Sequence, residues 1–325
     1  MKKPSVKPIV SKLNNIIIFF RKPIIKVLIS FLIIVFVLIY FVSNYHELAY
    51  VVREIKPNYL FVFLALFFSF ITVCIGTFTW WFILSWLGYR RNVLAIVKGY
   101  ALAGLAKYIP GFVWQYAGRS YYLIDHKIPM KTIGLAIVLE FLMVTALGGI
   151  LSSASYLIVG YKIIESSSMI NLLIITLMIA LIMFVLFLPK IFISLTNKQT
   201  NQKNRLDNQF YWVAVIINFT GWIILSLAYS LIIASLRVEN ISFPIALFLH
   251  STNFFIGNLF LPIPNGLVVR EAIIVFLAKD LANEYSLILS SLLLRMAILF
   301  SEILLVVTLH IFSMMFPGNT QSSFE

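Results

Sequence analysis

The feature that most constrains this chain is a series of apolar segments, each about as long as a bilayer is thick. Hydrophobic residues make up 61% of the 325 residues and charged residues only 11%, whereas soluble domains usually carry about 25% charged residues. A helix needs about 20 apolar residues to cross a membrane. Such segments lie at 27–42 (extended by Ile24 and Ile25), 58–87, 132–160, 169–189, 210–235 and 285–314. The sequence therefore predicts an all-α polytopic membrane protein with about six full spans.

The polar segments at the ends and in the loops predict the domain organisation and the orientation. We divide the chain into a basic tail at 1–26, one transmembrane domain at 27–314 and a short tail at 315–325. The longest polar stretch, Ser194 to Gln209, is expected to be a loop, so no soluble catalytic domain is predicted. The N-terminal tail holds Lys and Arg but no acid. The positive-inside rule then places it in the cytoplasm, with the protein in the cytoplasmic membrane of a bacterium.

The net charge of +13 does not predict nucleic-acid binding. The cations lie in the tail and in loops beside apolar segments, which is typical of topology signals and of contacts with anionic lipid. Trp80, Trp81 and Trp86 near the end of the span 58–87 are expected at the membrane interface. Cys74, the only cysteine, lies in an apolar run and is expected to be a small core residue.

Two stretches interrupt the apolar pattern with Pro and Gly followed by an arginine. In the first, a short helix with a small-residue face ends at Pro110 and Gly111, and a second half-helix is expected from Val113 to Tyr122. In the second, between Phe243 and Ala278, the breaks are Pro262, Pro264, Asn265 and Gly266. Lipid does not tolerate exposed broken backbone, so such stretches must be packed in protein or line a wet cavity. We therefore expect two re-entrant helical elements.

These elements occupy corresponding places in the two halves of the chain. One half, about 58–160, has its break at 110–111, and the other, about 210–314, has its break at 262–266. With both elements re-entrant, most Lys and Arg fall on the side of the N-terminal tail, and the two elements enter from opposite faces. This order predicts an inverted repeat with a site near the midplane, as in many transporters.

Seven charged residues lie in apolar or broken segments and are our candidate substrate-binding residues. They are Lys107, Arg119, Glu140, Arg270, Glu271, Arg295 and Glu302. A charge at the bilayer centre costs about 2.5–3.5 kcal/mol on insertion scales, so it usually faces a cavity or a partner. The arginines suit a lipid phosphate, which they can bind bidentately. The alternatives are that Lys107 and Arg119 reach the cytoplasmic interface as anchors, and that the acids form structural salt bridges with the arginines.

Spacing argues against two other groupings of residues. Arg295 and Glu302 are seven residues apart, too far for a close pair within one helix, so each is expected to have its partner elsewhere. His250 and His310 lie in apolar segments, while His46 and His126 lie in loops, and no two are spaced as metal ligands. The sequence predicts no metal and no cofactor.

The motifs also resemble a known family. The pattern Lys-Tyr-Ile-Pro-Gly-x-x-Trp-(x)3-Gly-Arg at 107–119, the Leu-Glu at 139–140, the Pro-Asn-Gly-(x)3-Arg-Glu at 264–271 and Arg295 resemble the flippase-like transmembrane region of lysylphosphatidylglycerol synthases. In full-length relatives this region is thought to move aminoacylated phospholipid between leaflets, while a soluble domain transfers the amino acid. Asn265 stands where many relatives would have a second glycine. The resemblance implies a stand-alone transporter without the synthase domain.

Three classes of function stay open. The leading hypothesis is a flippase-like transporter, not an enzyme, for an anionic, aminoacylated or glycan-linked membrane lipid. The alternatives are a membrane-embedded glycosyl- or acyltransferase, for which Asp125-His126 offers an acid–histidine neighbour, and a non-transporting membrane subunit. Candidate protein partners are a second copy of the chain and envelope-biosynthesis enzymes.

Overall fold

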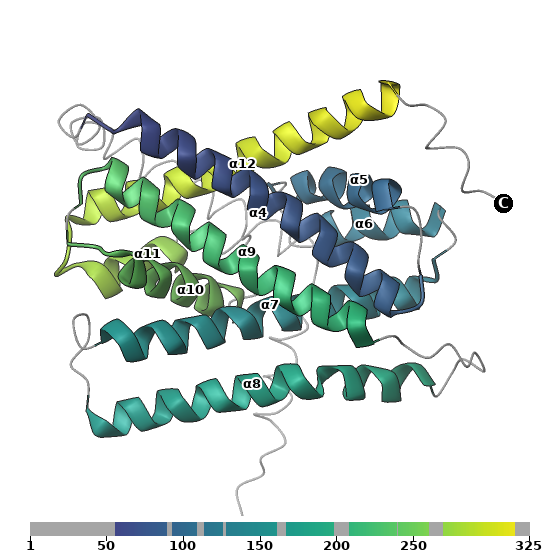
Figure 1. Ribbon diagram of the computed structural model, residues 1–325, viewed down its shortest axis with the longest axis horizontal. Coiled ribbons are helices and arrows are strands. Elements are labelled where there is room, and N and C mark those ends of the chain that lie inside the picture. Colours follow the sequence, from purple (N-terminus) through teal and green to yellow (C-terminus); the bar gives the residue numbers. More distant parts are fainter. Residues whose placement is uncertain are drawn as a thin grey trace, which may run out of the picture.

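All regular elements that the structure describes are helical. The computed structural model describes residues 56–89, 93–108, 114–125, 128–160, 167–197, 208–238, 240–259 and 269–315. Within these ranges five helices are long and apolar enough to cross a membrane: α4 (Tyr59–Trp86), α7 (Met130–Val159), α8 (Ser168–Asn197), α9 (Asn208–Ser235) and α12 (Glu284–Met315). They confirm the all-α polytopic membrane fold and five of the expected spans (Figure 1). The expected span at 27–42 lies outside the described residues.

The boundary predicted after residue 189 is wrong. Helix α8 continues through Pro189 to Asn197, so the first residues of the expected loop, from Ser194, are helical. A proline inside a helix deprives the carbonyl four residues earlier of its N–H partner. That carbonyl belongs to Val185, and it accepts a hydrogen bond from the Tyr211 hydroxyl of α9 at 2.7 Å. Because a side chain of another helix satisfies the freed oxygen, Pro189 does not end α8.

Each of the two interrupted stretches forms a pair of short helices. The first comprises α5 (Val93–Gly104), continued by the 3-10 turn η1 (Leu105–Tyr108), and α6 (Trp114–Asp125). We call α5, η1 and α6 hairpin 1. The second comprises α10 (Phe243–Leu259) and α11 (Val269–Ala278), which we call hairpin 2. Helices therefore flank both interruptions as expected, but the breaking residues themselves lie outside the described residues: Pro110, Gly111, Pro262, Pro264, Asn265 and Gly266.

The arms of hairpin 1 pack closely through the predicted small-residue face. A Cβ placed on Gly118 would lie 3.2 Å from the Cβ of Ala103. A Cβ on Gly99 would lie 2.1 Å from Cδ1 of Tyr122. Gly99 lies four residues before Ala103 on α5, whereas its neighbour Tyr122 lies four residues after Gly118 on α6. The two arms are therefore antiparallel.

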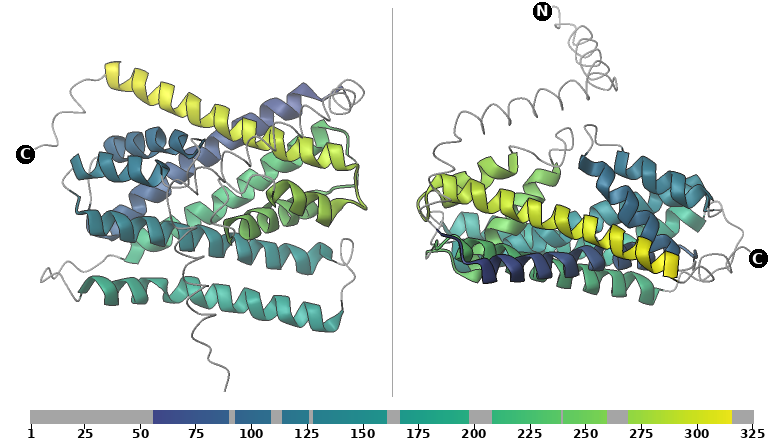
Figure 2. Two further views of the ribbon diagram at one scale, coloured as in Figure 1. Left: turned by 180° about the vertical axis from the view of Figure 1, so that it is seen from behind. Right: turned by 90° about the horizontal axis from the view of Figure 1, so that it is seen from above.

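Hairpins 1 and 2 lie at opposite ends of the long helices (Figures 1 and 2). The long helices α4 and α9 are antiparallel neighbours: Asn58 N–H donates to the Ser235 carbonyl at 3.0 Å, and Trp86 Nε1 donates to Asn208 Oδ1 at 3.3 Å. Hairpin 1 follows the end of α4 and hairpin 2 follows the end of α9. The order α4, hairpin 1, α7 is thus repeated as α9, hairpin 2, α12 in the opposite direction.

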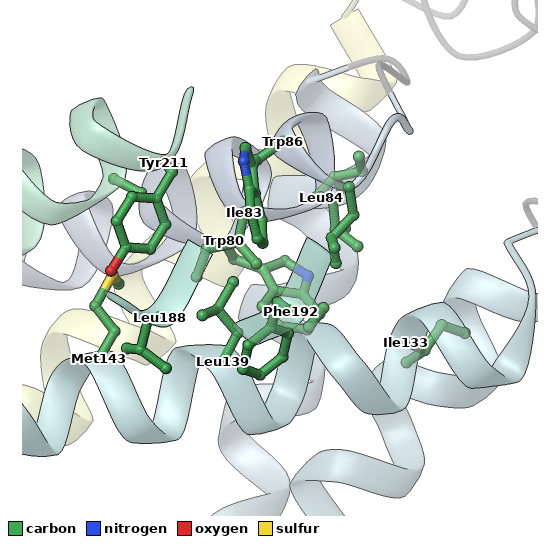
Figure 3. Close-up of a cluster of buried hydrophobic side chains, with 14 of the residues drawn as sticks. Trp80, Ile83, Leu84, Trp86, Ile133, Leu139, Met143, Leu188, Phe192 and Tyr211 are labelled. Atoms are coloured by element: carbon green, nitrogen blue, oxygen red, sulfur yellow. The ribbon is translucent and has the colours of Figure 1, made fainter. Parts of the chain in front are cut away.

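Two of the three tryptophans near the end of α4 belong to the protein core rather than to a lipid-facing belt, while Trp81 is partly exposed. Trp80 and Trp86 are 1% and 0% exposed, which corrects the interfacial placement expected for them. The Trp86 ring lies 5.5 Å from that of Tyr211 between centroids, and both pack with Leu139, Met143, Leu188 and Phe192 (Figure 3). The indole N–H finds an acceptor in Asn208, so burial leaves no unsatisfied donor.

The contact between the arms of hairpin 1 yields a prediction about stability. Gly99→Ala should lower the free energy of unfolding by about 1–3 kcal/mol, because the added methyl overlaps the Tyr122 ring. Gly104→Ala is the matched control, since it lies in the same helix and its Cβ would meet nothing within 4 Å. Thermal unfolding of both variants in detergent micelles checks this. A Gly99→Ala protein that melts at or above the temperature of Gly104→Ala would contradict the packing described.

Candidate functional site

The seven charged residues predicted from the sequence come from both hairpins and from α7 and α12. Lys107 and Arg119 lie on hairpin 1, Arg270 and Glu271 on hairpin 2, Glu140 on α7, and Arg295 and Glu302 on α12. We call these seven residues the central charge cluster. None of them is exposed. The structure pairs six of the seven.

The most enclosed pair joins hairpin 1 to α7. Arg119 Nη1 donates to Glu140 Oε2 at 2.5 Å, and the Tyr100 hydroxyl donates to the other carboxylate oxygen at 2.8 Å. The Arg119 guanidinium also stacks over the Tyr100 ring, 3.8 Å from its centroid, with Trp80 at 5.2 Å. Such ring faces stabilise a desolvated cation. Both charges are therefore held by several partners at once, which fixes α6 against α7.

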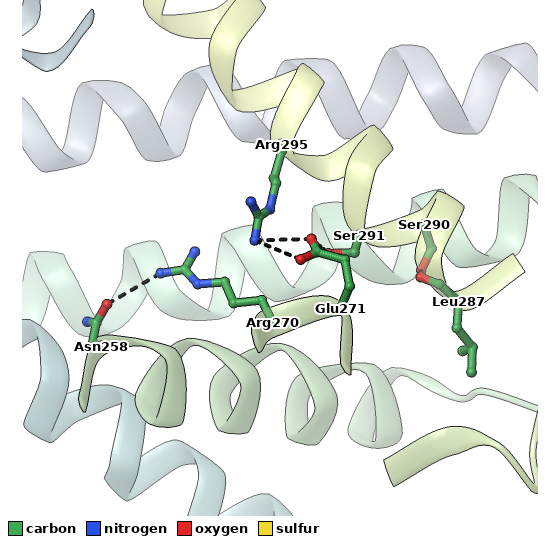
Figure 4. Close-up of polar contacts among 7 residues, drawn as sticks. All are labelled: Asn258, Arg270, Glu271, Leu287, Ser290, Ser291 and Arg295. Carbon is green, nitrogen blue, oxygen red and sulfur yellow. Dashed lines mark hydrogen bonds and ion pairs between the residues drawn. The ribbon is translucent and has the colours of Figure 1, made fainter. Parts of the chain in front are cut away.

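A second pair joins hairpin 2 to α12 (Figure 4). Arg295 Nη2 lies 3.1 Å from Glu271 Oε1, and the Ser291 hydroxyl donates to the same oxygen at 3.2 Å. Ser291 and Arg295 are four residues apart on α12 and so lie on one face of it. Glu271 stands in the first turn of α11, where the helix dipole favours an acid.

The third pair links hairpin 1 to the opposite half of the chain. Lys107, in η1, forms an ion pair with Glu302 of α12. The next residue, Tyr108, lies within electrostatic range of both Glu302 and Arg295. This confirms that Arg295 and Glu302 have separate partners, as their spacing predicted. Lys107 thus has a carboxylate of the other half as its partner.

The two pairs that join each hairpin to the next long helix are reciprocal. In the first half the hairpin supplies the arginine and α7 the glutamate; in the second half the hairpin supplies the glutamate and α12 the arginine. Glu140 lies ten residues after the start of α7, and Arg295 eleven residues after the start of α12. The contact is thus made at corresponding positions with the charges exchanged. Such an exchange leaves little residue-level similarity between the halves although the geometry is shared.

Contacts across the halves correspond as well. Lys107, close to the end of the first arm of hairpin 1, reaches α12. Asn258, close to the end of the first arm of hairpin 2, reaches α7, where its amide donates to the Thr145 hydroxyl at 3.2 Å. Each hairpin is therefore bound to the long helix of its own half through its second arm and to the long helix of the other half through its first arm.

Arg270 differs from the other members of the central charge cluster. Among the residues that the structure describes, no carboxylate lies within ion-pair distance of it. Its Nη2 donates to Asn258 Oδ1 at 3.3 Å, and its guanidinium lies 4.3 Å from the Phe254 ring centroid. Its buried Nε, like that of Arg119, has no hydrogen-bond partner in the described structure. Gly257 leaves room for this side chain, since a Cβ there would lie 2.9 Å from the Arg270 Nε.

Several residues that organise the site were not predicted. Three of them bind cluster members directly: Tyr100, Ser291 and Asn258. Thr145 in turn binds Asn258. An amide or hydroxyl inside an apolar helix indicates a polar partner, but Ser and Thr also bond to their own helix backbone, as Ser251 does with Leu247. Asn258 could therefore have been recognised from the sequence as a site residue, because its amide group has no such common backbone partner in a helix.

His250 is buried beside the cluster among aromatic rings. Its ring lies 5.6 Å from that of Trp222 and 5.9 Å from that of Tyr229 between centroids. No group of three or more His, Cys, Asp or Glu in the described part of the chain is arranged to hold a metal ion. The side chains of the Asp125-His126 neighbour pair lie outside the described residues.

Comparison of the sequence with models of known protein families finds no match, and a search among curated proteins finds none either.

The pair of Arg119 and Glu140 yields a prediction about coupled stability. Glu140→Met should lower the free energy of unfolding by about 3–5 kcal/mol, because it leaves the Arg119 charge buried without its counter-ion. The double variant Arg119→Met/Glu140→Met should lose less, because no unpaired charge remains. Denaturant titration in micelles measures both. Glu284→Gln, an exposed acid at the start of α12, is the control, with a change within about 0.5 kcal/mol. Additive losses would contradict the coupling.

Proposed function

We propose that this membrane protein is a flippase-like transporter that moves a lipid-linked or anionic headgroup between the two leaflets. The single observation that carries the proposal is the central charge cluster, built from two hairpins at opposite ends of the long helices. A structural core alone has no need of seven charged residues, because apolar packing is as stable as a buried ion pair or more so. A headgroup that crosses the membrane does need charged and polar groups along its path.

The length of the hairpin arms supports this function. The second arms, α6 and α11, have 12 and 10 residues, so they are about 18 and 15 Å long and too short for a hydrocarbon core of about 30 Å. Helix ends and loops within the membrane are tolerated where they are buried in protein or line a polar path. Broken helices of this kind commonly form substrate sites at the midplane of transporters.

One ion pair and one hydrogen bond between the halves provide the contacts that an alternating cycle would exchange. Lys107 with Glu302 ties hairpin 1 to α12, and Asn258 with Thr145 ties hairpin 2 to α7. Breaking one contact while keeping the other would open the cluster toward one face only. The equivalent movement of the other hairpin would open it toward the opposite face.

The resemblance of the 107–119 and 264–271 patterns to the flippase-like region of lysylphosphatidylglycerol synthases supports transport of a lipid and suggests aminoacylated or glycan-linked lipids as candidate substrates. The positive-inside rule favours a cytoplasmic N-terminus, and we place the protein in the cytoplasmic membrane. Hairpin 1 would then enter from the cytoplasmic face and hairpin 2 from the outer face.

Reconstitution tests the transport function. Vesicles that contain the protein and a fluorescent phosphatidylglycerol should show faster loss of fluorescence to an impermeant quencher than empty vesicles. Glu302→Gln should slow this exchange, because it leaves Lys107 without a counter-ion and weakens the link between hairpin 1 and α12. Glu284→Gln, on the same helix but exposed, should exchange lipid like the wild type. Exchange no faster than in empty vesicles, or unchanged in Glu302→Gln, would contradict the proposal.

A further inference from the structure

The charges of the central cluster do not balance. It contains the four cations Lys107, Arg119, Arg270 and Arg295 but only the three acids Glu140, Glu271 and Glu302, which leaves one positive charge. Three cations each contact one of the three acids. In a medium of low dielectric an uncompensated charge is costly, so the excess charge favours binding of an anion.

The position of the excess charge is defined by the contacts. Arg270 has a neutral amide and an aromatic ring as its described partners, and its buried Nε–H lacks an acceptor. It also lies within electrostatic range of Arg295, while its own guanidinium points away from Glu271 toward Asn258 (Figure 4). The nearby Glu271 carboxylate forms its ion pair with Arg295, so Arg270 has no ion-pair partner among the described residues. The first turn of α11 adds peptide N–H groups, and these also favour an anion.

We infer that Arg270 and the first turn of α11 form a binding site for a phosphodiester that carries a single negative charge. Asn258 orients the guanidinium through Nη2 from one side, which leaves the other terminal nitrogen of the fork for phosphate oxygens. The assignment rests on the transport function proposed above, because it names the headgroup class that would be moved.

The net charge of one distinguishes between kinds of headgroup. A phosphodiester brings one negative charge and neutralises the cluster. A phosphomonoester brings about 1.5–2 negative charges at pH 7, as phosphorylated side chains do, and would leave part of that charge uncompensated. A zwitterionic headgroup adds a cation beside Arg270 and Arg295, and an aminoacylated one with a free amine does the same. The singly charged phosphodiester should therefore bind most tightly.

Equilibrium binding to the full-length protein in detergent tests this site. The probe is radiolabelled dioctanoyl phosphatidylglycerol, with dioctanoyl phosphatidylcholine, dioctanoyl phosphatidic acid and soluble glycerophosphoglycerol as competitors. Arg270→Gln should weaken probe binding about tenfold or more, since it removes the charged hydrogen bonds. Lys279→Gln removes an exposed cation just beyond the other end of α11 and should bind like the wild type. Arg270→Lys keeps the charge but loses the fork, so its affinity should be intermediate.

The competitor series on the wild type tests the same inference independently of how the variants fold. Phosphatidylcholine and phosphatidic acid should each compete about tenfold less well than unlabelled phosphatidylglycerol. If glycerophosphoglycerol competes, the site accepts soluble as well as lipid phosphodiesters. If it does not compete, the site accepts lipids only. Either result supports the phosphodiester class. Equal competition by the zwitterionic or the monoester lipid, or unchanged binding in Arg270→Gln, would overturn the assignment.

Binding and leaflet exchange can fail separately. Binding that depends on Arg270 without any lipid exchange would support the site and contradict the transport function. Lipid exchange together with phosphatidylglycerol binding that is indifferent to Arg270 would support transport and contradict the site.

Discussion

The structure depends on the compensation of charges that are enclosed among apolar helices. Such charges are tolerated only where each has a counter-charge or a set of dipoles. Arg119 meets this requirement with a carboxylate and the faces of aromatic rings, and Arg295 does so with a carboxylate that is shared with Ser291. Because each pair bridges a hairpin and a long helix, compensation also determines where the hairpins lie. The same ion pairs therefore neutralise the buried charges and hold the short helices against the long ones.

The exchange of charge between the two halves connects this constraint to function. The arginine of hairpin 1 corresponds to the glutamate of hairpin 2, and the glutamate of α7 corresponds to the arginine of α12. Two hairpins that are held by equivalent contacts from opposite ends can alternate between equivalent states, which is what alternating access requires. Arg270 is the one cation of the cluster without an acid partner among the described residues, and it lies in the second half only. In the proposed transport function, this excess charge would provide the anion site.

Hydropathy predicted the long spans well, because lipid demands length and apolarity whatever the neighbours are. It predicted the end of α8 badly, because whether Pro189 ends a helix depended on Tyr211, a residue of another helix. The burial of Trp80 and Trp86 was missed for the same reason, since an aromatic residue suits an interface and a core equally. All seven cluster residues were identified as charges in apolar or broken segments, but their pairing was not, because partners such as Lys107 and Glu302 are 195 residues apart.

Opposite orientation of the two hairpins is the claim on which the whole account depends, and labelling of single cysteines measures it most directly. In a Cys74→Ala background, Met130→Cys places an exposed thiol beyond the end of α6, and Asp280→Cys places one beyond the end of α11. An impermeant thiol reagent should label these two variants from opposite faces of sealed membrane vesicles of known orientation. Labelling of both from the same face would show that the hairpins share one side, and it would contradict the account.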